Sequence, residues 1–252
     1  MGPILELKNV SKSFGNLHAI DDVSFGVAEK SVTILIGPNG SGKTTLINVA
    51  GGFYKPDSGR VIYQGKDITG LAPHKVYQAG VVRTFQIPQL FWKMTVLENV
   101  MAARKGHPGE MFSKAMVSSM WRDDEQETAE QAFRVLEIIG LVHMWDELAN
   151  SLSGGQMKLL EIGRALMSGA KTILMDEPIS GVNPTLAHSI FSTLLSLRED
   201  FGITFLFVEH RLDIALSYVD EVVAMAYGKL LAVGKPTEVM SDTRIIEAYL
   251  GG

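Results

Sequence analysis

The feature that most restricts the fold of this chain is a glycine-rich segment that joins an apolar run to a helix-forming run. The apolar run, Val32 to Ile36, is continuous, which is typical of a strand buried on both faces of a parallel sheet. The segment after it satisfies the pattern G-x-x-x-x-G-K-[ST] in full and reads Gly37-Pro38-Asn39-Gly40-Ser41-Gly42-Lys43-Thr44. Residues 43–50 then predict a helix. A strand, a glycine-rich turn and a helix in this order predict a phosphate-binding loop.

The residue types in this loop suit a nucleoside triphosphate. Glycines allow backbone N–H groups to converge on phosphate oxygens, and a helix N-terminus adds partial positive charge. Lys43 supplies a mobile cation for the β- and γ-phosphates, and the Thr44 hydroxyl is placed to bind Mg²⁺. We expect ATP to be held by residues 37–44 and by Thr45.

A second apolar run, Ile173 to Met175, ends in two carboxylates, Asp176 and Glu177. A P-loop enzyme needs one carboxylate to hold Mg²⁺, which we assign to Asp176, and Glu177 can polarise the attacking water. A pair of this kind by itself is more often a strand end that faces solvent. The complete phosphate-binding loop upstream reverses that preference and favours hydrolysis.

A third motif, Leu152-Ser153-Gly154-Gly155-Gln156, opens a run that predicts a helix to about Met167. Ser153 is a favourable N-cap, and the two glycines leave backbone donors uncovered at the positive end of the helix. A capped helix with a flexible start is the structural alternative. The chain has one phosphate-binding loop and one such spare anion site, so a symmetric pair could place each spare site over the γ-phosphate held by the other copy.

The remaining pattern predicts an α/β fold with a mostly parallel sheet, an antiparallel β edge and a helical subdomain. Residues 5–8 and 23–27 alternate apolar and polar, as half-buried antiparallel strands do. Apolar residues at helical spacing from Ala129 onward fall in a helical subdomain of about residues 87–150, within a single domain of 252 residues. Further sheet strands are expected at residues 172–175, 204–208 and 221–225.

Composition excludes several classes of protein. The net charge of −5 demands no basic face, so nucleic acid is not an expected partner. The absence of cysteine excludes disulfides, thiolate metal sites and cysteine nucleophiles. No apolar run approaches the roughly 18 residues that cross a bilayer. Any role at a membrane is therefore expected to require another protein.

The order of these motifs resembles the ABC ATPase family over essentially the whole chain. The resemblance implies that Gln86 senses Mg²⁺ and water, and that His210 contacts the γ-phosphate. It implies that Phe14 stacks on adenine, although a core-facing aromatic is the alternative, and Asn183 stands where the family more often has Asp. The signature motif, which caps ATP in trans, corresponds to Ser153, Gly154, Gly155 and Gln156.

Several short stretches resemble the ATPases of branched-chain amino-acid importers, among them residues 52–56, 83–86, 180–184 and 247–251. The resemblance implies an ATP- and Mg²⁺-dependent hydrolase at the cytoplasmic face of the membrane. Its implied partners are a second ATPase subunit, identical or different, and integral membrane permease subunits, but no nucleic acid. The alternatives are an importer of urea or short amides, a lipopolysaccharide exporter, a soluble ABC ATPase of DNA repair or translation, and an ATP-binding module without turnover.

An apolar run directly after Gln86 is the expected contact with the membrane partner. Its residues fit neither a helical nor a strand period, so the run need not all be core. We predict that part of it forms an exposed groove for a permease helix, and burial beneath the subdomain is the alternative. The run comprises Ile87, Pro88, Leu90, Phe91, Trp92 and Met94.

Overall fold

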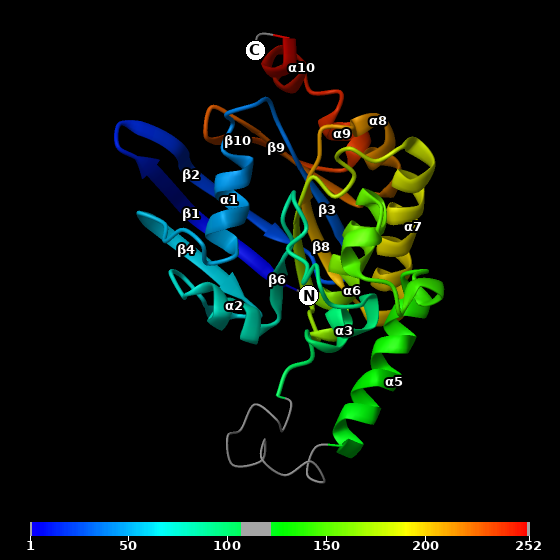
Figure 1. The fold of residues 1–252 in the computed structure, drawn as a ribbon. Helices are drawn as coiled ribbons and strands as arrows, with labels where there is room; N and C mark the ends of the chain where they lie inside the picture. The colour runs from blue at the N-terminus through cyan, green and yellow to red at the C-terminus, as the bar shows by residue number, and fades with distance from the viewer. Residues whose placement is uncertain (1, 107–121, 251–252) are drawn as a thin grey trace. The chain divides into compact units, whose positions relative to one another are not determined.

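The computed structural model describes residues 2–106 and 122–250 (Figure 1). The described chain divides into two compact units. We call Met1–Gln86 together with Lys171–Gly252 the core unit, and Ile87–Ala170 the helical unit. The predicted subdomain at residues 87–150 begins where the helical unit begins, and its assignment as a subdomain of one 252-residue domain stays a prediction.

A six-stranded sheet runs through the core unit. Its strand order is β10 (Lys229–Gly234), β9 (Glu221–Ala226), β3 (Val32–Ile36), β8 (Thr204–Val208), β7 (Thr172–Asp176) and β6 (Val81–Arg83). Every neighbouring pair is parallel except β9 and β10. In register, Ile34 lies beside Phe207 on one side and Val222 on the other, and all three are fully buried. The predicted mostly parallel sheet with strands at these places is confirmed.

A four-stranded antiparallel sheet forms the second layer, in the order β2 (Leu17–Val27), β1 (Leu5–Phe14), β4 (Ser58–Tyr63), β5 (Lys66–Asp67). The alternation read from the sequence holds, because Leu5 and Leu7 are buried while Lys8 is exposed. This sheet is the predicted antiparallel edge.

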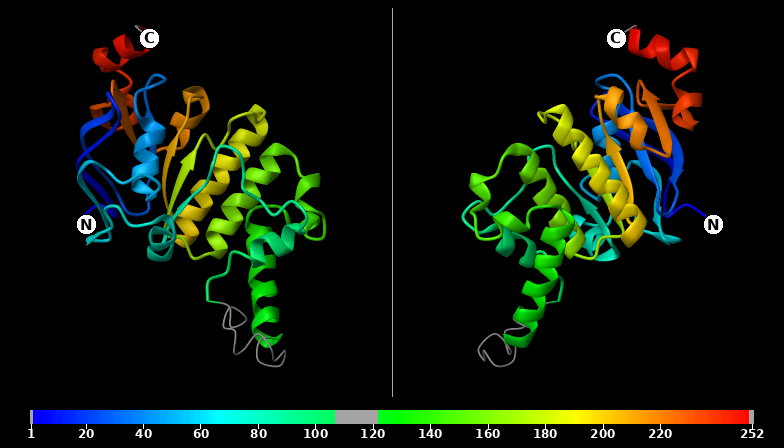
Figure 2. Two further views of the ribbon diagram at one scale, coloured as in Figure 1. Left: turned by 60° about the vertical axis from the view of Figure 1, so that its left-hand side comes forward. Right: turned by 90° about the vertical axis from the view of Figure 1, so that its right-hand side faces the viewer.

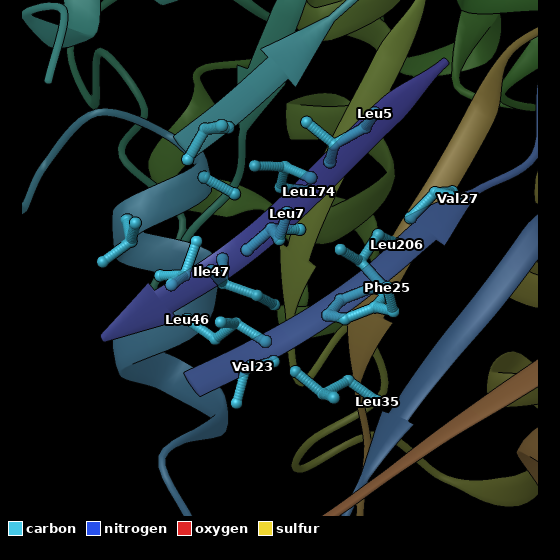
Figure 3. Packing of buried hydrophobic residues seen from close by; sticks show 14 of the residues in the cluster. Leu5, Leu7, Val23, Phe25, Val27, Leu35, Leu46, Ile47, Leu174 and Leu206 are labelled. Atoms are coloured by element: carbon cyan, nitrogen blue, oxygen red, sulfur yellow. The ribbon is translucent and has the colours of Figure 1, made fainter. Parts of the chain in front are cut away.

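Helix α1 (Lys43–Ala50) lies between the two sheets, as Figure 3 shows. Its Leu46 and Ile47 belong to one buried cluster with Leu7 of β1 and with Leu174 and Leu206 of the parallel sheet. Burial of an aliphatic side chain of this size stabilises a fold by about 1.5–3 kcal/mol. The cluster therefore fixes the N-terminal end of α1, where the glycine-rich loop enters it.

The other helices of the core unit follow the sheet strands. The longest is α7 (Pro184–Phe201), which packs on β8 (Figure 2), begins at the N-cap Asn183 and ends at Gly202 in the left-handed conformation. The shorter ones are α2 (Pro73–Ala79), α8 (Leu212–Ala215), η5 (Leu216–Tyr218), α9 (Pro236–Val239) and α10 (Thr243–Leu250).

In its described residues, 87–106 and 122–170, the helical unit contains three helices that pack on one another: α3 (Val96–Met101), α5 (Arg122–Ile138) and α6 (Gly154–Met167). Short turns η3 (Val142–Met144) and η4 (Ala149–Ser151) join α5 to α6 (Figures 1 and 2). The helical stripe of α5 is confirmed, since Ala132 and Leu136 are fully buried. Gly163 of α6 permits the close approach of this stripe, because a Cβ there would lie 2.6 Å from Ile139 Cδ1. Within the described ranges, no helix combines the length and apolarity needed to cross a bilayer.

Candidate functional site

The glycine-rich loop joins β3 to α1 in a backbone conformation that two glycines make possible. Gly37 and Gly42 have φ angles of 150° and 97°. A Cβ at Gly37 would lie 2.0 Å from the carbonyl oxygen of Met225, and one at Gly42 would lie 2.2 Å from that of Ala19. Other residues are excluded at both positions because the obstacle is backbone. The loop can therefore bend tightly enough to point backbone N–H groups at one small volume.

The ammonium group of Lys43 lies inside this loop. Its Nζ donates to the carbonyl oxygens of Gly37 at 2.8 Å and Pro38 at 2.9 Å. Burial lowers the pKa of Lys43, and the carboxylates of Asp176 and Glu177 oppose that shift. A buried cation held beside two acidic side chains is suited to meet a phosphate group.

Three predicted site residues meet at one edge of the parallel sheet. Strands β6, β7 and β8 run in the same direction, so the residues that follow them emerge together. The Gln86 Nε2 donates to Glu177 Oε2 at 2.7 Å, and the His210 Nε2 lies 3.4 Å from Glu177 Oε1. Glu177 has φ 51°, a left-handed value that a non-glycine residue adopts at a cost of about 1–3 kcal/mol. Strain of this kind is typical of functional sites, and here it aims one carboxylate between an amide and an imidazole.

Asp176 has a partner that the sequence analysis missed. Its Oδ2 accepts from Arg83 Nη2 at 3.3 Å, and the two side chains are only 12% and 7% exposed. Burial raises the pKa of Asp176, and Arg83 and Lys43 oppose that rise. The Arg83 guanidinium lies 5.1 Å from the Phe53 ring centroid and 5.0 Å from that of Phe85, and the two rings contact each other edge to face at 5.5 Å.

Arg83 also reaches the helix that follows the phosphate-binding loop. Its Nη1 donates to Asn48 Oδ1 of α1, and Asn48 Nδ2 donates to the Thr44 carbonyl at 2.9 Å. The only signal in the sequence is an arginine two positions before Phe85, which does not identify its carboxylate.

A cavity of about 310 Å³ collects much of the predicted nucleotide site. Phe14 lies at its wall with 44% of its surface exposed, and its ring is 5.2 Å from that of Tyr54 in an edge-to-face contact. The alternative, a core-facing Phe14, is therefore wrong. The cavity is lined by Phe14, Leu17, Ala19, Asn39, Gly40, Gly42, Lys43, Thr44, Thr45, Glu177 and His210.

Ser41 is the remaining polar residue of the loop. It is 1% exposed, and its hydroxyl oxygen has no hydrogen-bond partner among the described residues. A buried hydroxyl without a partner costs free energy, so a ligand oxygen or an ordered water is its expected companion.

The signature motif lies in the helical unit, at the start of α6. Ser153 is the N-cap and forms a capping box with Gln156: Gln156 N donates to Ser153 Oγ at 3.4 Å, and Ser153 N donates to Gln156 Oε1 at 2.9 Å. A Cβ at Gly154 would meet nothing within 4 Å, so the backbone there is open to an approaching group. The predicted N-cap is confirmed.

A family model described as ABC transporter matches residues 20–180 of the chain. The chain belongs to the ABC transporter family. Among curated ABC proteins, it is 50% identical to the probable branched-chain amino acid transport ATP-binding protein LivG of Archaeoglobus fulgidus, covering 98% of this chain and 95% of the relative. It is 50% identical to the protein of the same name from Methanocaldococcus jannaschii, covering 98% and 97%. It is 37% identical to the high-affinity branched-chain amino acid transport ATP-binding protein BraF of Pseudomonas aeruginosa, covering 99% and 98%.

Solved structures agree with the assignment to the ABC family. The ADP conformation of an ATP-binding cassette of an ABC transporter is 49% identical, has a TM-score of 0.86 and covers 100% of both chains. A dimeric cassette in a post-hydrolysis state, bound to ADP and phosphate, is 25% identical with a TM-score of 0.74, covering 92% of this chain and 98% of that one. The predicted fold class of this ABC cassette, an α/β core with an antiparallel β layer and helices, is thus confirmed, and the chain is an ABC-type ATPase.

Proposed function

We propose that this chain binds MgATP in the loop of residues 37–45 and hydrolyses it to power a branched-chain amino-acid importer. The observation that carries the hydrolytic part is the convergence of Lys43, Asp176, Glu177, Gln86 and His210 in the core unit. The names of relatives 37–50% identical to it support the transported substrate. We further propose one domain over residues 1–252, with the helical subdomain at 87–150.

The residues present fit both ATP and Mg²⁺. The unpartnered Ser41 hydroxyl and the glycine-built loop suit phosphate oxygens, and the exposed Phe14 ring suits an adenine face. Mg²⁺ favours oxygen ligands and commonly uses one or two carboxylates with phosphate oxygens. We assign its protein ligands to Thr44, Asp176 and Gln86. In the described part of the chain, no group of three acidic or histidine side chains could hold a metal by itself, which suits an ion that depends on the nucleotide.

The chemistry follows from positions around the γ-phosphate. Bound Mg²⁺ supplies charge that stabilises the phosphoryl group in transit. Lys43 contributes a cation to the same oxygens, and burial makes that charge effective. Glu177 accepts a hydrogen bond from the attacking water and thereby orients it. Gln86 and His210 hold the Glu177 carboxylate at its two oxygens, which restricts its rotation.

The active form is proposed to be a head-to-tail dimer. At the start of the signature motif of residues 153–156, Gly154 presents open backbone at a helix N-terminus, suited to the phosphate bound by a second ATPase subunit. Two dimeric cassettes at 25% and 26% identity support such pairing. The pair is proposed to sit on integral membrane permease subunits, as a peripheral component at the cytoplasmic face. Nucleic acid is not a proposed partner.

The test is steady-state phosphate release by the purified chain. We expect turnover that EDTA abolishes and that Lys43→Ala reduces to background, because the substitution removes the phosphate cation. Lys75, exposed on α2, provides the matched control as Lys75→Ala, which should hydrolyse ATP at the wild-type rate. Turnover unchanged in Lys43→Ala would refute the assignment. Co-purification with membrane subunits rather than nucleic acid separates a transporter from a repair or translation factor.

A further inference from the structure

A buried acidic residue, Glu209, precedes His210 and has no role in the site as described above. It lies between β8 and α8 and is only 2% exposed. Its Oε1 accepts a hydrogen bond from the backbone N–H of Ile179 at 2.8 Å. Its Oε2 accepts from the N–H groups of His210 at 3.0 Å and Arg211 at 3.5 Å. The carboxylate therefore joins two segments that lie 30 positions apart.

The two joined segments flank the proposed catalytic carboxylate. We call residues 209–211 the switch segment and residues 177–183 the β7–α7 loop. Besides the Glu209 bond, Arg211 Nη1 donates to the carbonyl oxygen of Val182 at 3.1 Å. At the base of the loop, the N–H of Glu177 donates to the Val208 carbonyl at 3.0 Å. The β7–α7 loop is thus tied to the end of β8 at its base, and to the switch segment at its middle and its far end.

We propose that Glu209 is a positioning residue that makes the switch segment and the β7–α7 loop move as one piece. A displacement of His210 on meeting a γ-phosphate is then passed to the loop, and the position of the loop is passed back to His210 and Glu177. This inference rests on the proposed function, because it assigns His210 to the phosphate. It adds a residue outside the nucleotide cavity, whose lining does not include Glu209.

The chemistry of the contact explains why a carboxylate is needed. Glu209 uses both oxygens as acceptors, and an ionised carboxylate is the side chain of this length that only accepts. In Glu209→Gln the amide nitrogen must face either Ile179 N–H or the His210 and Arg211 N–H groups, so one side is lost to donor–donor opposition. In Glu209→Asp the side chain is one methylene shorter. It can still cap its own segment but cannot reach Ile179.

These two variants separate coupling from local capping. A third variant, Arg211→Met, removes the hydrogen bond to Val182. The Arg211 side chain is 34% exposed, so we expect the substitution to cost the fold little stability. Glu199→Gln is the matched control, because Glu199 is a 65% exposed carboxylate on α7 away from both segments. Each variant is measured in the full-length chain for kcat and KM of ATP hydrolysis and for Tm. Each is also placed in a Glu177→Gln background, where ATP-dependent dimerisation is followed by light scattering.

We expect Glu209→Gln and Glu209→Asp to lower kcat by roughly tenfold or more, the loss that one charge-assisted hydrogen bond represents. KM should change less than threefold, because the cavity is intact, and ATP-dependent dimerisation should weaken. Arg211→Met should shift the same quantities in the same direction by a smaller factor, and Glu199→Gln should leave them unchanged.

Wild-type kcat in Glu209→Asp would overturn the proposal, because the bond to Ile179 would then be dispensable. A fall in kcat confined to variants with a lowered Tm, with Arg211→Met normal, would also overturn it in favour of a purely structural role. If the wild-type chain itself shows no ATPase activity, the proposed function fails first and is thereby distinguished from a failure of the coupling.

Discussion

The ion pair between Arg83 and Asp176 allows a quantitative test of how the proposed Mg²⁺ ligand is held. The perturbation is Arg83→Met, which keeps an unbranched side chain against the Phe53 and Phe85 rings but removes the charge. Removing one partner of a buried pair typically costs about 3–5 kcal/mol, because the other charge is left uncompensated.

Two features of the structure reduce that figure for Arg83→Met. Asp176 can take up a proton, which from its ordinary pKa of 3.8 limits the penalty near pH 7 to about 4 kcal/mol. Lys43 remains as a second cation that favours the carboxylate. We therefore expect a loss of about 2–4 kcal/mol in the free energy of unfolding, or roughly 5–15 °C in Tm for a chain of this size.

The assay is urea unfolding without nucleotide for wild type, Arg83→Met, Asp176→Asn and the double variant. If the pair interacts directly, the double variant is less destabilised than the sum of the single variants by at least about 1 kcal/mol. Arg198→Met is the control, because Arg198 pairs with Asp220, whose side chain is 47% exposed, and ion pairs open to solvent contribute about 0–1 kcal/mol. Additivity within about 0.5 kcal/mol would refute the reasoning, as would a loss under 1 kcal/mol in Arg83→Met.

The remaining predictions concern the dimer and the membrane partner. Glu177→Gln should bind ATP without hydrolysing it. Light scattering should then give about twice the chain mass of 27.5 kDa with ATP, and the mass of one chain without ATP. A monomer at saturating ATP would contradict the head-to-tail dimer. Trp92 is 43% exposed in the helical unit, so Trp92→Ser should abolish pull-down by permease subunits while basal ATPase activity and Tm stay unchanged. Phe91→Ser should also abolish pull-down, with some loss of stability because the Arg164 guanidinium lies 4.9 Å from the Phe91 ring. The control Leu90→Ser, at a residue 6% exposed, should lower Tm by several degrees; an equal loss at Trp92 would mean that the run is core.

Local pattern was sufficient where neighbouring residues determine the structure. The order of β3, the glycine-rich loop and α1 is written in contiguous residues, and α1 spans the predicted 43–50. The N-cap of α6 at Ser153 is equally local. A periodic pattern of apolar residues can be recognised only over several positions. The three-residue β6 and the two-residue β5 are too short for one, so the sequence did not predict these strands.

Pairings fixed by sheet order could not be predicted from the sequence. Arg83 and Asp176 are 93 positions apart and meet because β6 and β7 are neighbours, and nothing in either strand states that adjacency. Glu209 was overlooked for the same reason, since its partner Ile179 follows a different strand. The apolar run after Gln86 was predicted to be mixed, and its residues do divide: Phe91 and Trp92 are exposed while Leu90 is buried.

The close approaches at Gly37 and Gly42 make these two positions intolerant of substitution, while the residues that they approach can be replaced. The atoms nearest to such a Cβ are main-chain carbonyl oxygens, those of Met225 and Ala19, which every amino acid carries. Replacing Met225 or Ala19 leaves these oxygens in place, so substitutions at those two positions do not allow another residue at Gly37 or Gly42. The dependence runs one way: no compensating change at position 19 or 225 can restore a cassette that has lost either glycine. The need for both glycines is thus set first by the path of the neighbouring backbone, and at Gly37 the Ser41 hydroxyl, 2.7 Å from such a Cβ, adds a second obstacle.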